Sequence, residues 1–219
     1  CFPLIVKPDA EGSSVGITND SLVFDAVALK EQVSKILRDY DQPALVEEYV
    51  DGREFAVSLL GNPPKVLPIV EINFDHLPDG IHKFDSWEAK WIYDNPNGSV
   101  DAVIVPAELK PKLKAQIEKV AKQTFEKLGC VDLARIDIRL DSEGAPNVLD
   151  VNALPGLMPD PKKNSRFPRS CYAAGMTYDD IILTILHSAM ERYNLLPEPV
   201  SQRTRTGNGK TTPLEGEVG

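Results

Sequence analysis

The sequence predicts an α+β fold in which helices flank antiparallel sheets. Short runs of β-branched and aliphatic residues recur along the chain, and three longer segments, 24–40, 107–128 and 178–194, have apolar residues at helical spacing. The turn at 141–144 is too short to join parallel strands, so the runs on either side of it should form an antiparallel hairpin. Strands and helices do not alternate regularly, which argues against a parallel sheet.

The predicted strands are bounded by residues typical of turns and cover 2–7, 44–50, 54–60, 66–72, 103–105, 133–140 and 147–154. Asp51 and Gly52 predict a hairpin turn between the second and third of these strands. Gly129 is expected to end the second helix, and Thr177 is expected to cap the start of the last one. The segment 74–100 is polar and contains Gly and Pro, so it should be a long mobile loop.

The composition restricts the classes of function. The 219 residues carry a formal net charge of −9, which argues against nucleic acid as the main partner. No apolar run approaches the roughly 20 residues of a membrane span, so no membrane partner is expected. The three cysteines lie far apart without zinc-type spacing and are expected to be free thiols in a reducing compartment, the cytoplasm.

The hairpin around 141–144 is the most informative segment. Because side chains alternate along a strand, one face of it should present Arg135, Asp137 and Arg139. The short turn places Asp137 roughly opposite Asp150, with Asn152 on the same face. Two carboxylates and a carboxamide suit Mg²⁺, which prefers oxygen ligands and usually keeps substrate phosphates as well. The alternative is a solvated strand face on which arginine pairs with aspartate.

Two further segments suit a nucleotide. Lys7 ends the first strand, and residues 11–16 form a Gly/Ser loop whose backbone N–H groups can cradle phosphate oxygens. The alternative for this loop is a flexible turn. Glu47 and Glu54 flank the turn at 51–52, where a carboxylate can accept hydrogen bonds from ribose and strand-end backbone can read an adenine edge. The alternative there is an exposed acidic hairpin.

In order and spacing, these motifs resemble the ATP-grasp superfamily and, within it, the D-alanine–D-alanine ligase family. The matching strings are 6–8, 11–16, 46–55, 88–90, 134–137 and 148–156, and the resemblance covers about residues 2–194. It implies an ATP-grasp fold without the N-terminal substrate domain. Residues 1–60 would be part of the small subdomain, 61–195 the C-terminal catalytic subdomain with a lid at 74–100, and 196–219 a disordered tail.

The resemblance also implies a ligase that forms a dipeptide of the D-alanyl-D-alanine type for peptidoglycan precursors. ATP phosphorylates the carboxylate of one amino acid, and the amine of a second one attacks the acyl phosphate. Lys7, Lys90 and the loop residue Ser14 are expected to bind the phosphates of ATP. Adenine is expected to contact Glu47 and the backbone of Tyr49 and Val50. Glu54 is expected to bind the ribose. Two magnesium ions, or manganese, are expected at Asp137, Asp150 and Asn152. The catalytic residues are expected to be Arg135 and the Gly156 N–H at the oxyanion and Ser13 on a closing loop, with Ser165 at the substrate.

The sequence departs from the family pattern at three places. Asp150 stands where the family usually has glutamate, and Trp91 where it often has tyrosine. The loop before Ser165 is longer than usual, so Lys162 and Lys163 are further candidates for the carboxylate of the second substrate.

Three hypotheses stay open. The preferred one is a dipeptide-forming ligase; the others are an ATP-grasp ligase for another amino acid or peptide, and a non-catalytic nucleotide-binding fragment. Because the chain starts inside a strand, we expect a fragment that is inactive alone. A homodimer stays open for a full-length protein.

Overall fold

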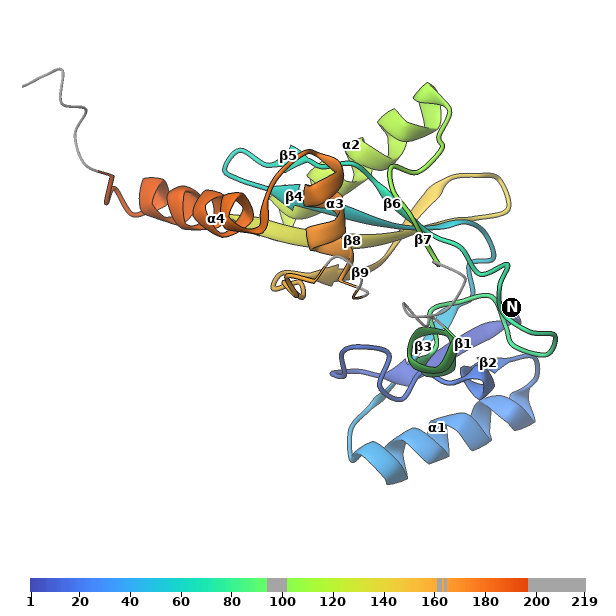
Figure 1. Ribbon diagram of the computed structural model, residues 1–219. Helices are drawn as coiled ribbons and strands as arrows, with labels where there is room; N and C mark the ends of the chain where they lie inside the picture. Colours follow the sequence, from blue (N-terminus) through green and yellow to red (C-terminus); the bar gives the residue numbers. More distant parts are fainter. Residues whose placement is uncertain (94–101, 161–162, 164, 197–219) are drawn as a thin grey trace, which may run out of the picture.

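Two antiparallel sheets, one of three strands and one of six, organise the chain in the computed structural model (Figure 1). The structure describes residues 1–93, 102–160, 163 and 165–196. The smaller sheet lies with the first long helix at one side of the molecule, and the larger sheet lies with the later helices at the other (Figure 1). No helix within these described ranges is long and apolar enough to cross a membrane.

The smaller sheet has the spatial order β2 (Leu22–Val23), β1 (Leu4–Pro8) and β3 (Ala44–Glu48), with the short 3-10 helix η1 (Asn19–Ser21) before β2. One face of this sheet packs against α1 (Ala26–Tyr40). Asp25 caps the start of this helix, because its carboxylate accepts hydrogen bonds from the N–H groups of Val27 and Ala28. Val6, Val23 and Ile36 are buried between sheet and helix, so this part of the chain has a small core of its own.

The larger sheet has the spatial order β7 (Val103–Ile104), β6 (Val70–Ile72), β4 (Glu54–Leu60), β8 (Leu133–Leu140) and β9 (Pro146–Asn152), with β5 (Lys65–Val66) paired to β4. Its aliphatic face packs against α2 (Pro111–Lys127). The buried side chains at this interface are Phe55, Val57, Leu59, Ile136, Ile138, Ile117, Ala121 and Phe125. The face of the β8–β9 hairpin that carries Ile136 and Ile138 is therefore buried and apolar.

The opposite face of the larger sheet is divided in two. At one end, α3 (Arg166–Ala173) and α4 (Tyr178–Arg192) cover Leu60 and Leu133 with Phe167, Cys171 and Ile181. At the other end, Ala56 pairs with Asp137, and the neighbouring pair is Glu54 and Arg139. The charged end of this face is the candidate functional site.

The predicted hairpin at Asp51–Gly52 is wrong. β3 pairs with β1 in the smaller sheet, whereas β4 pairs with β5, β6 and β8 in the larger one. Gly52 lies so close to β8 that a Cβ atom would come within 2.1 Å of the Leu140 carbonyl oxygen, so glycine here permits a close approach instead of a hairpin turn. The chain thus changes sheets between Glu48 and Glu54, before the predicted domain boundary after residue 60.

Other elements follow the prediction with shifted ends. The run 66–72 is divided into β5 and β6, with Pro68 between them, because proline cannot donate to a ladder. The predicted long loop contains η2 (Ala89–Tyr93), a single π-helical turn, and its part from 94 to 101 lies outside the described residues. The predicted tail, from 197 onwards, also lies outside them. Helix α3 was not predicted.

Candidate functional site

The β8–β9 hairpin brings the predicted metal ligands together. Asp137 lies opposite Asp150, and Arg135 lies opposite Asn152. The Asn152 Nδ2 atom donates to Oδ2 of Asp137 at 3.1 Å and to Oδ2 of Asp150 at 3.0 Å. Beyond Asp137 the register shifts, because Ile138 pairs with Val148 and Leu149 is left as a bulge. All three side chains therefore converge on one point of the sheet.

Arg135 is tied to the same point. Its Nε and Nη2 atoms donate to the two carboxylate oxygens of Asp137, both at 2.8 Å. This is the arginine–aspartate pairing of the alternative interpretation, but it leaves Asp150 and Asn152 outside the pair. The pairing of Arg135 with Asp137 therefore does not account for the second carboxylate, that of Asp150.

The donor set suits magnesium. Within the described part of the chain, no group of three or more His, Cys, Asp or Glu residues is arranged to hold a metal. Two carboxylates and one carboxamide are sufficient for Mg²⁺ when phosphates supply further oxygens. In the structure, the amide hydrogens of Asn152 lie where the carboxylates of Asp137 and Asp150 converge. Two negative charges at this point would attract a cation.

The predicted nucleotide residues lie on both sheets. On the smaller sheet, Nζ of Lys7 is 2.6 Å from Oε2 of Glu47. The N–H of Tyr49 donates to the Pro3 carbonyl at 3.2 Å, which holds the end of β3. Val50 follows in the connection to the larger sheet.

Glu54 lies on the larger sheet and is almost completely buried, at 5% exposure. Its carboxylate is 3.4 Å from Nη1 of Arg139. Burial raises the pKa of Glu54 to about 7, with Asp85 adding to the rise and Arg139 opposing it. Glu54 therefore sits near its titration point at neutral pH.

Arg139 contacts both the connection between the two sheets and the segment around Lys83. Its guanidinium donates to the Gly52 carbonyl and to the Tyr49 hydroxyl, each at 3.0 Å, and also to the Lys83 carbonyl. It also lies over the Tyr49 ring, 4.9 Å from the ring centroid. The sequence placed Arg139 on the charged face but gave it no role.

The Gly/Ser loop contacts the segment that was predicted to be a lid. Ser13 and Ser14 both have positive φ angles, of 56° and 62°. The Ser14 hydroxyl donates to the Asp85 carbonyl at 2.7 Å, and the Trp91 indole N–H donates to the Ser13 carbonyl at 3.2 Å. The N–H of Trp87 donates to the Ile17 carbonyl at 2.7 Å. Two segments that are remote in sequence are therefore docked on each other.

The same segment carries a buried charged cluster. Asp85 accepts two hydrogen bonds from Arg166, at 2.7 and 3.0 Å, and lies 3.7 Å from Nζ of Lys90. Burial by itself raises the pKa of Asp85, but Arg166 and Lys90 outweigh it and lower the pKa to about 2. Burial lowers the pKa of Lys90. The predicted phosphate lysine thus lies beside an ionised carboxylate. Neither Asp85 nor Arg166 was singled out from the sequence.

Ser165 and Gly156 meet despite the long loop between them. The Ser165 hydroxyl donates to the Gly156 carbonyl at 2.7 Å. The loop is held by two tyrosines, because Tyr178 donates to the Leu157 carbonyl at 2.9 Å and Tyr172 to the Pro159 carbonyl at 2.7 Å. Lys162 lies outside the described residues.

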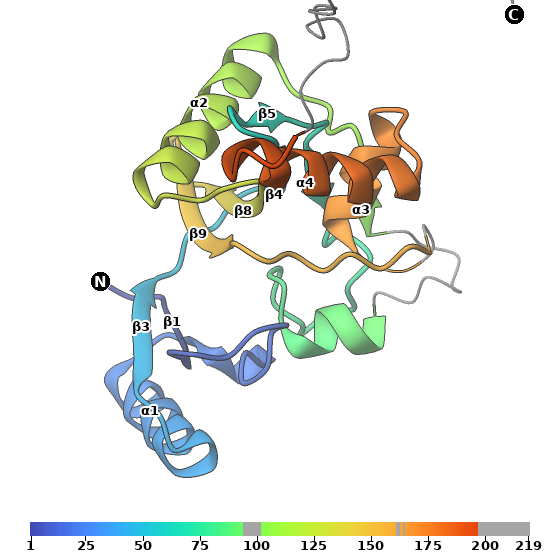
Figure 2. The same ribbon diagram turned by 90° about the vertical axis from the view of Figure 1, so that its left-hand side faces the viewer.

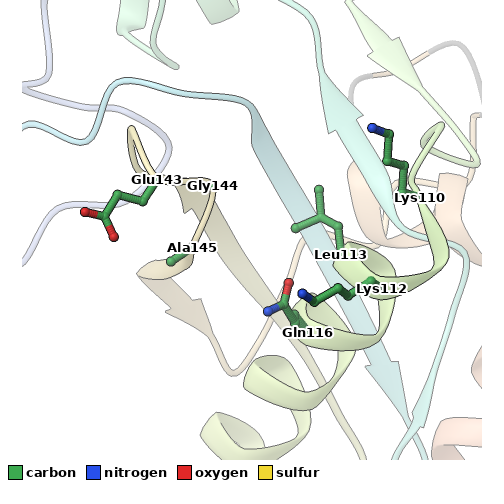
Figure 3. Close-up of a pocket in the computed structure, with 7 residues that line it drawn as sticks. All are labelled: Lys110, Lys112, Leu113, Gln116, Glu143, Gly144 and Ala145. Carbon is green, nitrogen blue, oxygen red and sulfur yellow. The ribbon is translucent and has the colours of Figure 1, made fainter.

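A surface cavity of about 370 Å³ lies away from these residues (Figure 3). It is formed by the start of α2 and the turn between β8 and β9, and is lined by Lys110, Lys112, Leu113, Gln116, Glu143, Gly144 and Ala145. Figure 3 shows Glu143 directed away from the helix. Because α2 covers the aliphatic face of the sheet, this cavity is separate from the charged face.

Sequence comparison decides the family. A family model described as "D-ala D-ala ligase C-terminus" matches residues 1–187. The chain belongs to this family. The ATP-grasp fold predicted from the sequence is confirmed by this match and by the structural neighbours below.

Curated relatives are moderately similar to this chain. The uncharacterized protein y4sG of Sinorhizobium fredii is 37% identical over 88% of this chain and 53% of its own length. The D-alanine–D-alanine ligase of Pelotomaculum thermopropionicum is 33% identical over 87% of this chain and 54% of its own length. The chain therefore spans about half the length of the curated relatives that it matches.

Solved structures of the family have a fold similar to that of this chain. The D-alanine–D-alanine ligase of Bacillus anthracis superposes with a TM-score of 0.66 at 27% identity, covering 88% of this chain and 56% of that one. Its complex with ATP gives a TM-score of 0.65 at 25% identity, with 88% and 54% covered. The family thus includes a ligase whose structure with ATP is known.

Proposed function

We propose that this chain is the nucleotide-binding part of an ATP-dependent carboxylate–amine ligase. The observation that carries the proposal is the convergence of Asp137, Asp150 and Asn152 on one point of the β8–β9 hairpin. Membership of the D-ala D-ala ligase C-terminus family supports it. The ligands would be ATP and small amino acids, and we place the protein in the cytoplasm, where both occur.

Magnesium would bind at Asp137, Asp150 and Asn152, as two ions, with manganese as an alternative. When bound, the metal neutralises the charge of the nucleotide phosphates. Lys7 and Lys90 would add positive charge beside the phosphates of ATP. Each lysine is held beside a carboxylate, so its position is set before the nucleotide arrives.

The base and ribose would bind where the two sheets meet. The N–H of Tyr49 is engaged by Pro3, which leaves the Tyr49 carbonyl and the Val50 backbone for the adenine edge. Glu47 lies on the strand that leads to this point, and Glu54 would accept hydrogen bonds from the ribose.

The reacting groups would lie between the hairpin and the loop before α3. Arg135, held in a fixed orientation by Asp137, and the N–H of Gly156 would stabilise the oxyanion that forms when the amine attacks. Ser165 would bind the carboxylate of the second substrate. Ser13 and Ser14, docked on the segment 80–93, would exclude water from the acyl phosphate.

The product we propose is a dipeptide of the D-alanyl-D-alanine type, used in peptidoglycan precursor synthesis. The names of several relatives support this choice. The long loop at 157–165 favours a second candidate, a ligase for another amino acid or peptide. We further propose that a full-length protein forms a homodimer.

A binding experiment tests the nucleotide part. Mg-ATP should raise the melting temperature of this chain, because a ligand specific for the folded state stabilises it. The Asp137→Ala variant should lose the magnesium-dependent part of this shift, measured with and without a chelator. Glu143→Ala, an exposed position on the same hairpin, is the control and should keep it. If millimolar Mg-ATP leaves the unmodified chain unchanged, the proposal is wrong.

An activity experiment tests the ligase part. In the longest polypeptide that contains this chain, addition of D-alanine should stimulate ADP formation. Asp137→Ala should reduce that rate at least about 100-fold. A panel of amino acids and dipeptides then separates the two substrate candidates. Unchanged turnover in Asp137→Ala would remove the metal assignment.

A further inference from the structure

Asp85 contacts three segments that carry predicted site residues. Its backbone carbonyl accepts the Ser14 hydroxyl of the Gly/Ser loop. Its carboxylate lies 3.7 Å from Lys90 on η2 and accepts both hydrogen bonds of Arg166 at the start of α3. Figure 2 shows η2 between the smaller sheet and α3, which is the place where such a contact can join them. Asp85 thus connects the phosphate side with the helix that begins directly after Ser165.

The cluster is shielded from water. The side chain of Arg166 is 4% exposed, and those of Lys90 and Asp85 are 15% and 19% exposed. Charges in such surroundings interact more strongly than on the surface, and a bidentate arginine–carboxylate pair also fixes the relative orientation of its partners. The Nε atom of Arg166 is buried and has no hydrogen-bond partner among the described residues. The hydrogen bonds that this guanidinium donates within the described residues go to Asp85.

We propose that Asp85 is a positioning residue of the ligase reaction, which holds Lys90 for the nucleotide phosphates and, through Arg166, holds Ser165 for the second substrate. This inference rests on the proposed function. Asp85 itself would touch neither substrate. Its carboxylate separates two cations that would otherwise repel each other, and it opposes the lowering of the Lys90 pKa that burial causes.

Ser165 connects this cluster to the reacting groups. It immediately precedes Arg166, and its hydroxyl is directed to the Gly156 carbonyl instead of capping α3. A shift of Arg166 would therefore move Ser165 relative to Gly156. The nucleotide lysine and the second substrate site are coupled through a single carboxylate.

Asp85→Asn is the first test. In titration calorimetry on this chain, it should weaken Mg-ATP binding about tenfold, since the lysine loses its partner. In the ligase assay, Asp85→Asn should raise KM for both ATP and the second substrate. Arg166→Met should raise KM for the second substrate with little change for ATP. If the Asp85–Arg166 contact only stabilises the fold, both variants should lower the melting temperature. They should then not differ in whether KM for ATP rises together with KM for the second substrate.

The control is Asp75→Asn, which also lies in the predicted loop 74–100. Asp75 pairs with Lys83 at 2.8 Å, but both side chains are exposed, so binding and KM should not change. The double variant Asp85→Asn/Arg166→Met should cost no more in KM for the second substrate than Asp85→Asn alone, because both changes break one contact.

The outcomes separate the two proposals. If the unmodified chain does not bind Mg-ATP, the proposed function fails and this inference fails with it. If it binds, but Asp85→Asn binds within about twofold and keeps both KM values, only the role of Asp85 is overturned. Should Asp85→Asn not fold, Asp85→Glu replaces it: it keeps the charge but displaces it by one methylene, and unchanged KM values in that variant overturn the inference equally.

Discussion

The β8–β9 hairpin and the segment 80–93 present charged side chains to the same site, but they are held in different ways. The hairpin is fixed by a ladder of backbone pairs and by a buried aliphatic face under α2. The segment 80–93 is held mainly by side-chain contacts to loops and to α3, such as those of Asp85 and Trp91. The hairpin should therefore be rigid, whereas the segment can be released by changing single side chains.

The largest expected effect comes from removing the support beneath the hairpin. Ile136 is fully buried behind Arg135 and Asp137, so Ile136→Ala should lower the free energy of unfolding by about 3–4 kcal/mol. Urea denaturation measures this, and Ile104→Ala is the control because Ile104 is 39% exposed on β7. A loss below about 1 kcal/mol would contradict a hairpin held by its core.

The hairpin shows how much the sequence could predict. Asp137 and Asp150 face each other because a short turn and a period of two fix the register, and both are visible in 20 residues of sequence. The helices were predicted for the same reason, since their apolar spacing is local. The short α3 was missed: it has eight residues, and Pro168 lies within it.

The rest of the site depends on contacts between distant residues. Asp85 and Arg166 are 81 positions apart, and nothing local distinguishes them from solvated charges. The hairpin predicted at Asp51 and Gly52 was wrong for a related reason. The glycine serves a close approach to Leu140, and a dipeptide typical of hairpins does not reveal which sheet the next strand joins.

A pH experiment addresses the residue that lies between the two regions. Burial raises the pKa of Glu54 to about 7 in the folded protein, above the 4.5 of an exposed glutamate. The folded state then holds a proton that the unfolded state has lost, so this group contributes full stability below pH 4.5 and loses it as the pH rises through 7. In Glu54→Gln this loss, at most about 3 kcal/mol, should disappear.

The comparison is between unfolding free energies at pH 5 and pH 7.5. Glu126→Gln, at an exposed position on α2, should keep the slope of the unmodified chain. An identical slope in Glu54→Gln would mean that Glu54 is ionised at both pH values and that Arg139 outweighs burial.

The smallest expected effect lies in the segment 80–93 alone. Trp91→Phe removes the indole N–H that donates to the Ser13 carbonyl at 3.2 Å, while 59% of this side chain is exposed. The local cost should be about 0.5–1 kcal/mol, without a measurable change in global unfolding. Hydrogen exchange should quicken at the Trp87 amide, which donates to the Ile17 carbonyl across the same contact.

Ile92→Ala changes an exposed neighbour on η2 and should leave that exchange rate unchanged. If Trp91→Phe lowered global stability as much as Ile136→Ala, the segment and the hairpin would unfold as one cooperative unit. Faster exchange at Trp87 with an unchanged hairpin would instead show that the two regions open independently. Independent opening would support the proposal that this segment closes over a nucleotide.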